Sequence, residues 1–133
     1  MIYLDSGVIM RLVAAPADVR AELEKLIGSQ KVVTSQVAYI ECVCKPIELK
    51  MIEVVQAFDA YFDSSDVDLV DVDSAIARVA AYVRANFKLK VPDAIHLATA
   101  LETKCHTFLT TDSDFERCRT QSSIEFNVFR SSI

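Results

Sequence analysis

Short apolar segments alternate with longer segments of helical periodicity along this whole sequence. The apolar segments have the length and the β-branched residues of buried strands, and turn or capping residues separate them from the helical segments. We expect strands over 1–4, 31–34, 67–72, 107–110 and 125–129. We expect helices over 16–27, 36–44, 47–62, 75–87, 93–103 and 113–119. This alternation favours an α/β domain with a mostly parallel central sheet between helices.

The chain length is one that a single hydrophobic core can serve. With 133 residues, we expect one domain over 1–133. Only 2 glycines and 3 prolines are present, too few for a turn-dense all-β sandwich. No apolar run approaches the ~20 residues of a bilayer span, and Asp5 stands where a secretory signal would need its apolar core. We therefore expect a cytoplasmic protein with no membrane partner and with 4 reduced cysteines.

The charge of the chain is unevenly distributed. The net charge is −5, from 19 acidic and 14 basic residues, which taken alone disfavours a nucleic-acid partner. However, the segment 59–73 carries acidic residues and no base, whereas bases outnumber acids over 74–133. The acidic total therefore does not exclude RNA.

Four acidic residues occupy positions where a charged side chain needs an interaction partner or a functional role. Asp5 ends the first strand, Asp112 follows the strand over 107–110, and the carboxyl ends of parallel strands share one edge of a sheet. Glu41 falls beside the apolar face of its helix, and Asp93 opens the most apolar helix. Singly, each could be a helix cap, a complement to a helix dipole or half of an ion pair. Jointly, converging carboxylates would repel one another unless they bind a hard divalent cation such as Mg²⁺ or Mn²⁺.

Several sequence motifs carry these acids. The motifs are I-Y-L-D-S-G at 2–7, the stretch V-V-T-S-Q-V-A-Y-I-E that ends at Glu41, V-P-D-A-I-H-L-A-T-A-L at 91–101, and F-L-T-T-D-S-D-F at 108–115. Over nearly the whole chain, they resemble the PIN-domain ribonucleases and, within these, the VapC-like toxins of type II toxin–antitoxin pairs. The last two motifs with their spacing carry most of the resemblance. A departure is small: Ser6 stands where many members have Thr, and it keeps the hydroxyl.

The resemblance implies a fold, an activity and partners. The implied fold is a three-layer α/β/α domain. The implied activity is Mg²⁺- or Mn²⁺-dependent hydrolysis of RNA phosphodiester bonds by a metal-activated water, leaving a 5′-phosphate and a 3′-hydroxyl. Asp5, Asp93 and Asp112 would hold the metal, and Glu41 would hold metal or orient the attacking water. The implied partners are an RNA substrate, a second copy of the chain and a small antitoxin that covers the site.

Other residues near these motifs have less specific interpretations. For Asp114 we expect a solvent-exposed or capping role rather than a place in the site. His96 follows Asp93 by one helical turn and could orient it, although a packed, locally hydrogen-bonded histidine is the ordinary case. Arg84 could contact phosphate, but we expect a surface arginine.

Two other functions stay open. A receiver-like signalling domain also binds Mg²⁺ through acids at strand ends, but it needs adjacent acids after its first strand and a lysine after its last. Here Ser6 follows Asp5, and 125–133 contains no lysine. A PIN-like RNA-processing nuclease that is not a toxin, or a module that binds without cutting, is the other alternative.

Overall fold

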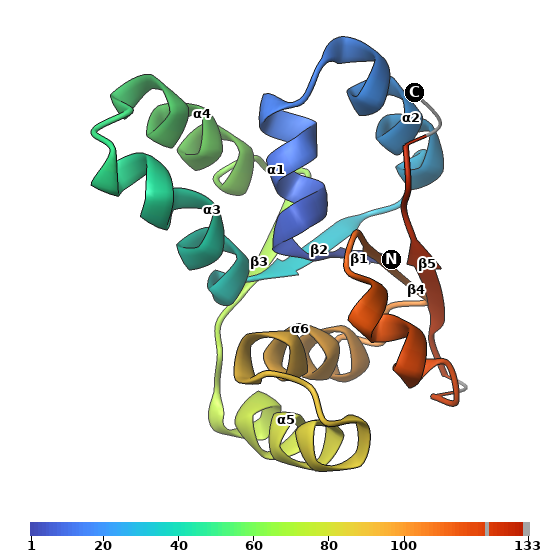
Figure 1. The fold of residues 1–133 in the computed structure, drawn as a ribbon. Helices are drawn as coiled ribbons and strands as arrows, with labels where there is room; N and C mark the ends of the chain where they lie inside the picture. Colours follow the sequence, from blue (N-terminus) through green and yellow to red (C-terminus); the bar gives the residue numbers. More distant parts are fainter. Residues whose placement is uncertain (122, 132–133) are drawn as a thin grey trace.

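The computed structural model describes residues 1–121 and 123–131 of the chain. Over these residues, five strands form one sheet in the order β3-β2-β1-β4-β5 (Figure 1). All the strand pairs are parallel. The strands are β1 (Ile2–Leu4), β2 (Val32–Ser35), β3 (Val67–Val70), β4 (Thr107–Thr110) and β5 (Glu125–Val128). The expected parallel α/β architecture is thus confirmed.

Helices cover both faces of this sheet (Figure 1). One face carries α1 (Ser6–Ala14), α2 (Ala17–Ile27), α3 (Gln36–Glu48) and α4 (Ile52–Phe62). The other carries α5 (Ser74–Phe87) and α6 (Val91–Glu102), which pack against each other. A 3₁₀ helix, η1 (Ser113–Cys118), joins β4 to β5. The molecule therefore has three layers, as the resemblance implied.

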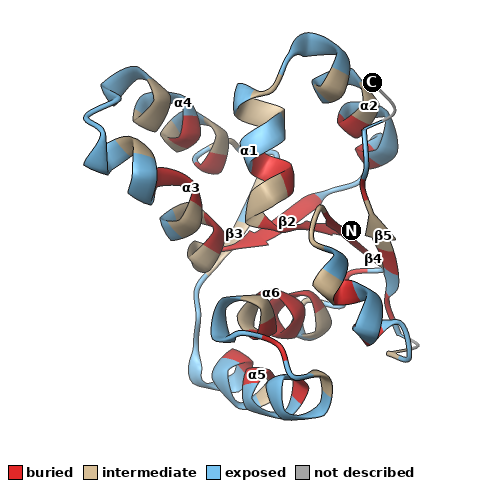
Figure 2. Cartoon of the chain, in the orientation of Figure 1, coloured by how far each residue is buried: buried red, intermediate tan, exposed pale blue. Residues whose placement is uncertain are grey.

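The central strand divides its side chains between two cores. Ile2 and Leu4 point into the core beneath α1–α4, whereas Tyr3 points into the core beneath α5 and α6. The buried residues in Figure 2 follow the strands and the sheet-facing side of α6. Because β1 has a neighbour on each side and helices on both faces, the residue that follows it is held rigidly.

Short polar side chains start several of the helices. Asp5 caps α1 by accepting from the Val8 N–H at 3.2 Å, and Ser35 caps α3. Ser74 does not cap α5. The preceding residue, Asp73, accepts from the Ile76 N–H at 2.9 Å, and Ser74 is the first helical residue.

Two segments differ from the sequence interpretation. Asp5-Ser6-Gly7 reads as a turn, but α1 begins at Ser6. Glycine suits the second helical position because a Cβ on Gly7 would lie 2.2 Å from the Thr111 hydroxyl oxygen. The break expected between the helices over 36–44 and 47–62 lies later in the chain: α3 runs to Glu48, and α4 starts at Ile52 after Lys50, whose φ is 56°.

In the described part of the chain, every helix is too short or too polar to cross a membrane.

Candidate metal-binding active site

The four predicted acids come from four different elements. Asp5 follows β1, and Asp112 follows β4, the strand hydrogen-bonded to β1. Asp93 is the third residue of α6, and Glu41 lies in the first half of α3. Residues far apart in the sequence are therefore brought to the carboxyl edge of the sheet, where parallel α/β proteins place their sites.

Three carboxylates gather at this edge. One oxygen each from Asp93, Asp112 and Asp114 lies within 4.8 Å of the other two, and all three side chains are half-buried. Burial, together with the nearby charge of Asp112, raises the pKa of Asp93 to about 6. The carboxylate of Asp112 therefore disfavours the ionised form of Asp93. Among the described residues, Asp5 and Glu41 belong to no such group of three.

Asp114 lies closer to the predicted site than expected. Its N–H donates to Asp112 Oδ1 at 2.8 Å, so Asp112 is both the cap of η1 and a member of the cluster. A guanidinium nitrogen of Arg117 lies 3.3 Å from the Asp114 carboxylate. The tight 3₁₀ turn brings these side chains together, and the sequence shows only that two acids stand two positions apart. Asp114 thus lies in the acidic cluster, although we expected a solvent-exposed or capping role rather than a place in the site, and the cap of η1 is Asp112.

Asp5 is held in the sheet edge itself. Its side chain is 6% exposed, accepts from the Val8 N–H on one oxygen, and accepts from the Thr110 hydroxyl on the other. Burial raises the pKa of Asp5, the Thr110 hydrogen bond opposes that rise, and the Asp112 charge adds to it. The carboxylate is therefore fixed in direction before any ligand binds.

Glu41 makes the contact that the sequence did not identify. His96 Nε2 lies 2.6 Å from Glu41 Oε1, and His96 Nδ1 lies 2.6 Å from the Tyr3 hydroxyl. Burial would raise the pKa of Glu41, but the hydrogen bonds from His96 and Ser6 bring it below its usual value. His96 therefore pairs with Glu41 rather than orienting Asp93, the role considered from its spacing. Its helical position gave no sign of a partner 55 residues away.

Arg84 is exposed on α5, as expected for a surface arginine.

The donor set suits a hard divalent cation. Its oxygens come from carboxylates, which Mg²⁺ and Mn²⁺ prefer. A bound cation would neutralise the repulsion between Asp93 and Asp112, and water would not. The described residues include no cysteine–histidine group with the spacing of a zinc site.

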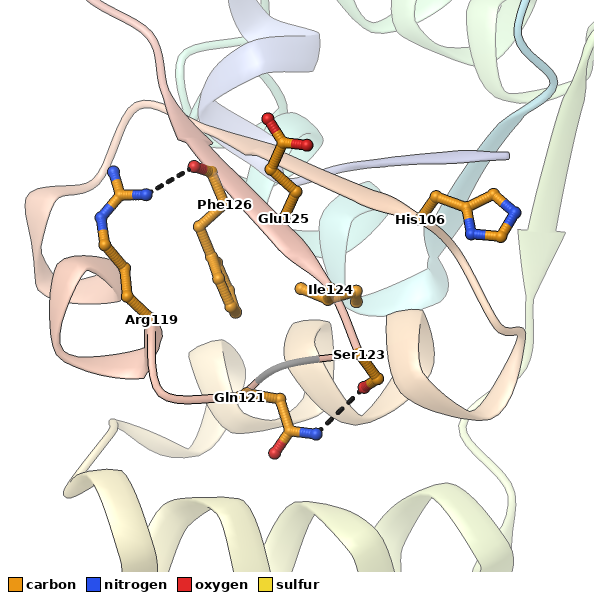
Figure 3. Close-up of a pocket in the computed structure, with 7 residues that line it drawn as sticks. All are labelled: His106, Arg119, Gln121, Ser123, Ile124, Glu125 and Phe126. Carbon is orange, nitrogen blue, oxygen red and sulfur yellow. Dashed lines mark hydrogen bonds between the residues drawn. The ribbon is translucent and has the colours of Figure 1, made fainter.

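A separate hollow of about 480 Å³ lies at the opposite ends of β4 and β5 (Figure 3). His106, just before β4, and Glu125, the first residue of β5, contribute to its lining. Its polar groups largely bond to each other or to backbone: Arg119 donates to the Phe126 carbonyl at 2.8 Å, and Gln121 bonds to Ser123. Because none of the clustered acids reaches it, we place the candidate site at the carboxyl edge.

Fold and site together define a class: parallel α/β proteins that gather carboxylates at the carboxyl edge of the sheet. The PIN domain family model matches residues 2–120. The chain belongs to the PIN domain family, and the receiver-like interpretation is set aside. No curated protein matches the sequence.

Solved structures share this fold at low sequence identity. A toxin–antitoxin complex from Klebsiella pneumoniae is 22% identical with a TM-score of 0.69, over 86% of this chain and 90% of that one. VapBC2 from Rickettsia felis, bound to a DNA fragment from its promoter, is 14% identical with a TM-score of 0.74, over 96% and 98%. VapC20 from Mycobacterium tuberculosis, a toxin that cleaves the sarcin-ricin loop, is 18% identical with a TM-score of 0.73, over 89% and 95%.

Proposed function

We propose that this chain is a metal-dependent endoribonuclease and the toxin of a type II toxin–antitoxin pair. The observation that carries the proposal is the cluster of Asp93, Asp112 and Asp114 oxygens within 4.8 Å of one another at the carboxyl edge of a PIN domain. The similarity of the fold to toxins and toxin–antitoxin complexes supports the biological role.

In this proposal the acidic residues have different roles. Asp93, Asp112 and Asp114 hold Mg²⁺ or Mn²⁺, and the buried Asp5 adds a fixed negative charge or a further ligand oxygen beside them. When bound, the cation acidifies a water and neutralises charge that builds on the phosphate. Glu41 holds metal or accepts the proton of the attacking water, because its carboxylate is partly exposed and ionised near neutral pH. Hydrolysis leaves a 5′-phosphate and a 3′-hydroxyl.

The proposed partners follow from the same relatives. Because structures of this fold include complexes with an antitoxin, we propose that a small antitoxin binds this chain and blocks the site. We also propose that the chain forms a homodimer and acts in the cytoplasm. The second candidate is a PIN nuclease that processes RNA and is not a toxin. A growth assay distinguishes the two candidates.

The test combines RNA cleavage with growth. The purified chain should cut RNA with Mg²⁺ or Mn²⁺, EDTA should stop it, and Asp112→Asn should be inactive while the distant surface variant Asp18→Asn stays active. Cleavage that survives exhaustive chelation would contradict the metal mechanism. Expression of this chain should arrest growth, and co-expression of the small protein encoded by the neighbouring gene should restore growth. Equal growth in both cases, with expression confirmed, would favour the non-toxin nuclease.

A further inference from the structure

A buried hydrogen-bonded chain leads from the central strand to Glu41. It consists of the Tyr3 hydroxyl, the His96 imidazole and one oxygen of the Glu41 carboxylate, with both distances at 2.6 Å. Tyr3 is 0% exposed and His96 is 1% exposed, whereas the Glu41 side chain is 33% exposed. The chain therefore runs from the interior of the sheet to a carboxylate at the surface of the site.

The two aromatic rings are fixed by packing. The Tyr3 ring stacks on Phe108 of the neighbouring strand at a centroid distance of 5.1 Å and an interplanar angle of 15°. The same ring meets His96 edge-on, at 5.7 Å and 65°. Because sheet and helix hold both rings, the imidazole has little freedom to turn away from Glu41.

Hydrogen-bond chemistry then assigns the protons. An ionised carboxylate only accepts, so His96 Nε2 carries the hydrogen that lies between it and Glu41. In a neutral imidazole the other nitrogen accepts, and the tyrosine hydroxyl is available to donate to it. With a neutral imidazole, the Tyr3 hydroxyl therefore donates to Nδ1 and the Nε2–H donates to Glu41.

We propose that Tyr3 and His96 are positioning residues for Glu41. Tyr3 fixes the Nε2–H tautomer of His96, and His96 holds Oε1 of Glu41 so that the carboxylate presents its other oxygen to the site. This inference rests on the proposed nuclease function for its consequence, but the geometry exists without metal or RNA. A core selected for packing alone would use apolar side chains here, because two buried polar groups must find partners.

Nuclear magnetic resonance of the metal-free protein tests the geometry directly. The chain has 2 histidines, and His106 is exposed, so ¹⁵N-labelled imidazoles give two sets of signals that His106→Gln assigns. In its neutral form, His96 should be the Nε2–H tautomer, and Tyr3→Phe should shift its Nδ1 resonance. An Nδ1–H tautomer, or a His96 spectrum that Tyr3→Phe leaves unchanged, would overturn the proposal.

Kinetics test the consequence for Glu41. Tyr3→Phe and His96→Leu should lower kcat by about 10- to 100-fold, the usual loss for groups that orient a ligand side chain, with little change in KM for RNA. His96→Gln should recover much of the rate, because its amide N–H can still donate to Glu41. The matched control is Tyr39→Phe, which removes a hydroxyl of the same helix, α3, that donates to the Asp59 carboxylate of α4 at 2.6 Å, and it should leave kcat unchanged.

The possible failures are distinguishable. A wild-type protein that binds Mn²⁺ but never cleaves RNA contradicts the proposed function, while the tautomer measurement still decides the hydrogen-bonded chain. An active wild type whose Tyr3→Phe and His96→Leu variants keep full kcat overturns the positioning role. Circular dichroism and melting of each variant show that a lost rate does not reflect a lost fold.

Discussion

Replacing Asp93 by asparagine should stabilise the metal-free protein. Asp93 lies in the first turn of α6, where a negative charge ordinarily helps a helix. Here, however, burial and the charges of Asp112, Glu41 and Asp5 raise its pKa to about 6 from 3.8. The ionised carboxylate therefore weakens the fold, and Asp93→Asn removes the charge with almost no change in volume.

The size and pH range of the effect follow from the two pKa values. Well below pH 3.8 both the folded and the unfolded chain hold the proton, and the charge has no effect. As the pH rises towards 6, the unfolded chain releases its proton first, so the free energy of unfolding falls. The full difference would be about 3 kcal/mol, but Asp93 is half-buried and solvent screens it. We expect about 1 kcal/mol, or about 3 °C in Tm.

Thermal melting of both proteins, with EDTA and with Mg²⁺, measures this effect. At pH 7.5 in EDTA the variant should melt higher than wild type, and at pH 4 the difference should be much smaller. Mg²⁺ should reverse the order, because wild type gains about 2.7 kcal/mol at a hundredfold excess over Kd and the variant gains less. Asp18→Asn, in the first turn of α2 on the surface, is the control and should lower Tm slightly in every condition. An Asp93→Asn variant destabilised equally with and without metal would refute the metal-site assignment.

Three further predictions concern stability and reactivity. Cys44 is the exposed thiol and should react rapidly with an alkylating reagent at pH 8. Cys42, whose pKa burial raises to about 12, should react only after denaturation. Mass spectrometry of tryptic peptides measures the order of reaction, and the opposite order would contradict this prediction. Lys88→Gly should raise the free energy of unfolding by about 1 kcal/mol in urea, because Lys88 ends α5 with φ at 55°; an unchanged midpoint would contradict the strain. Thr110→Val should lower the free energy of unfolding by about 1 to 3 kcal/mol, because the hydroxyl donates to buried Asp5 and accepts from the Asp112 N–H. A loss no larger than the loss from the same substitution at a surface threonine would contradict this role.

The alternation of strands and helices was enough to predict the layers of this fold. Period-two and period-3.6 patterns depend on local sequence, and a parallel sheet between helices is the main arrangement that satisfies them. The sequence analysis did not predict helix α1, and this omission shows the limit of local patterns. Asp5-Ser6-Gly7 has the composition of a turn and also that of a helix start, and only the contact with Thr111 shows why the glycine is needed.

The candidate site was partly predictable for a similar reason. Asp5 and Asp112 follow adjacent parallel strands, so their common edge follows from topology. The place of Asp114 depends on how η1 turns once Phe115 is buried, and the pairing of His96 with Glu41 depends on how α6 packs beside α3. Such contacts are decided by tertiary packing, so no local pattern contains them. The catalytic roles of the four acids stay predictions.

The position of β1 at the centre of the sheet also determines when the site can form during synthesis. Ile2 pairs with Val32 on one side but with Thr107 on the other, so the second edge of the first strand is filled only after β4 has been synthesised. Contacts between such distant segments are formed late and slowly, and a ribosome adds only about 5–20 residues per second. A nascent chain that stops before residue 107 has neither Asp112 nor the strand that supports it. Any activity that depends on this edge of the sheet therefore begins only after residue 112 has been translated.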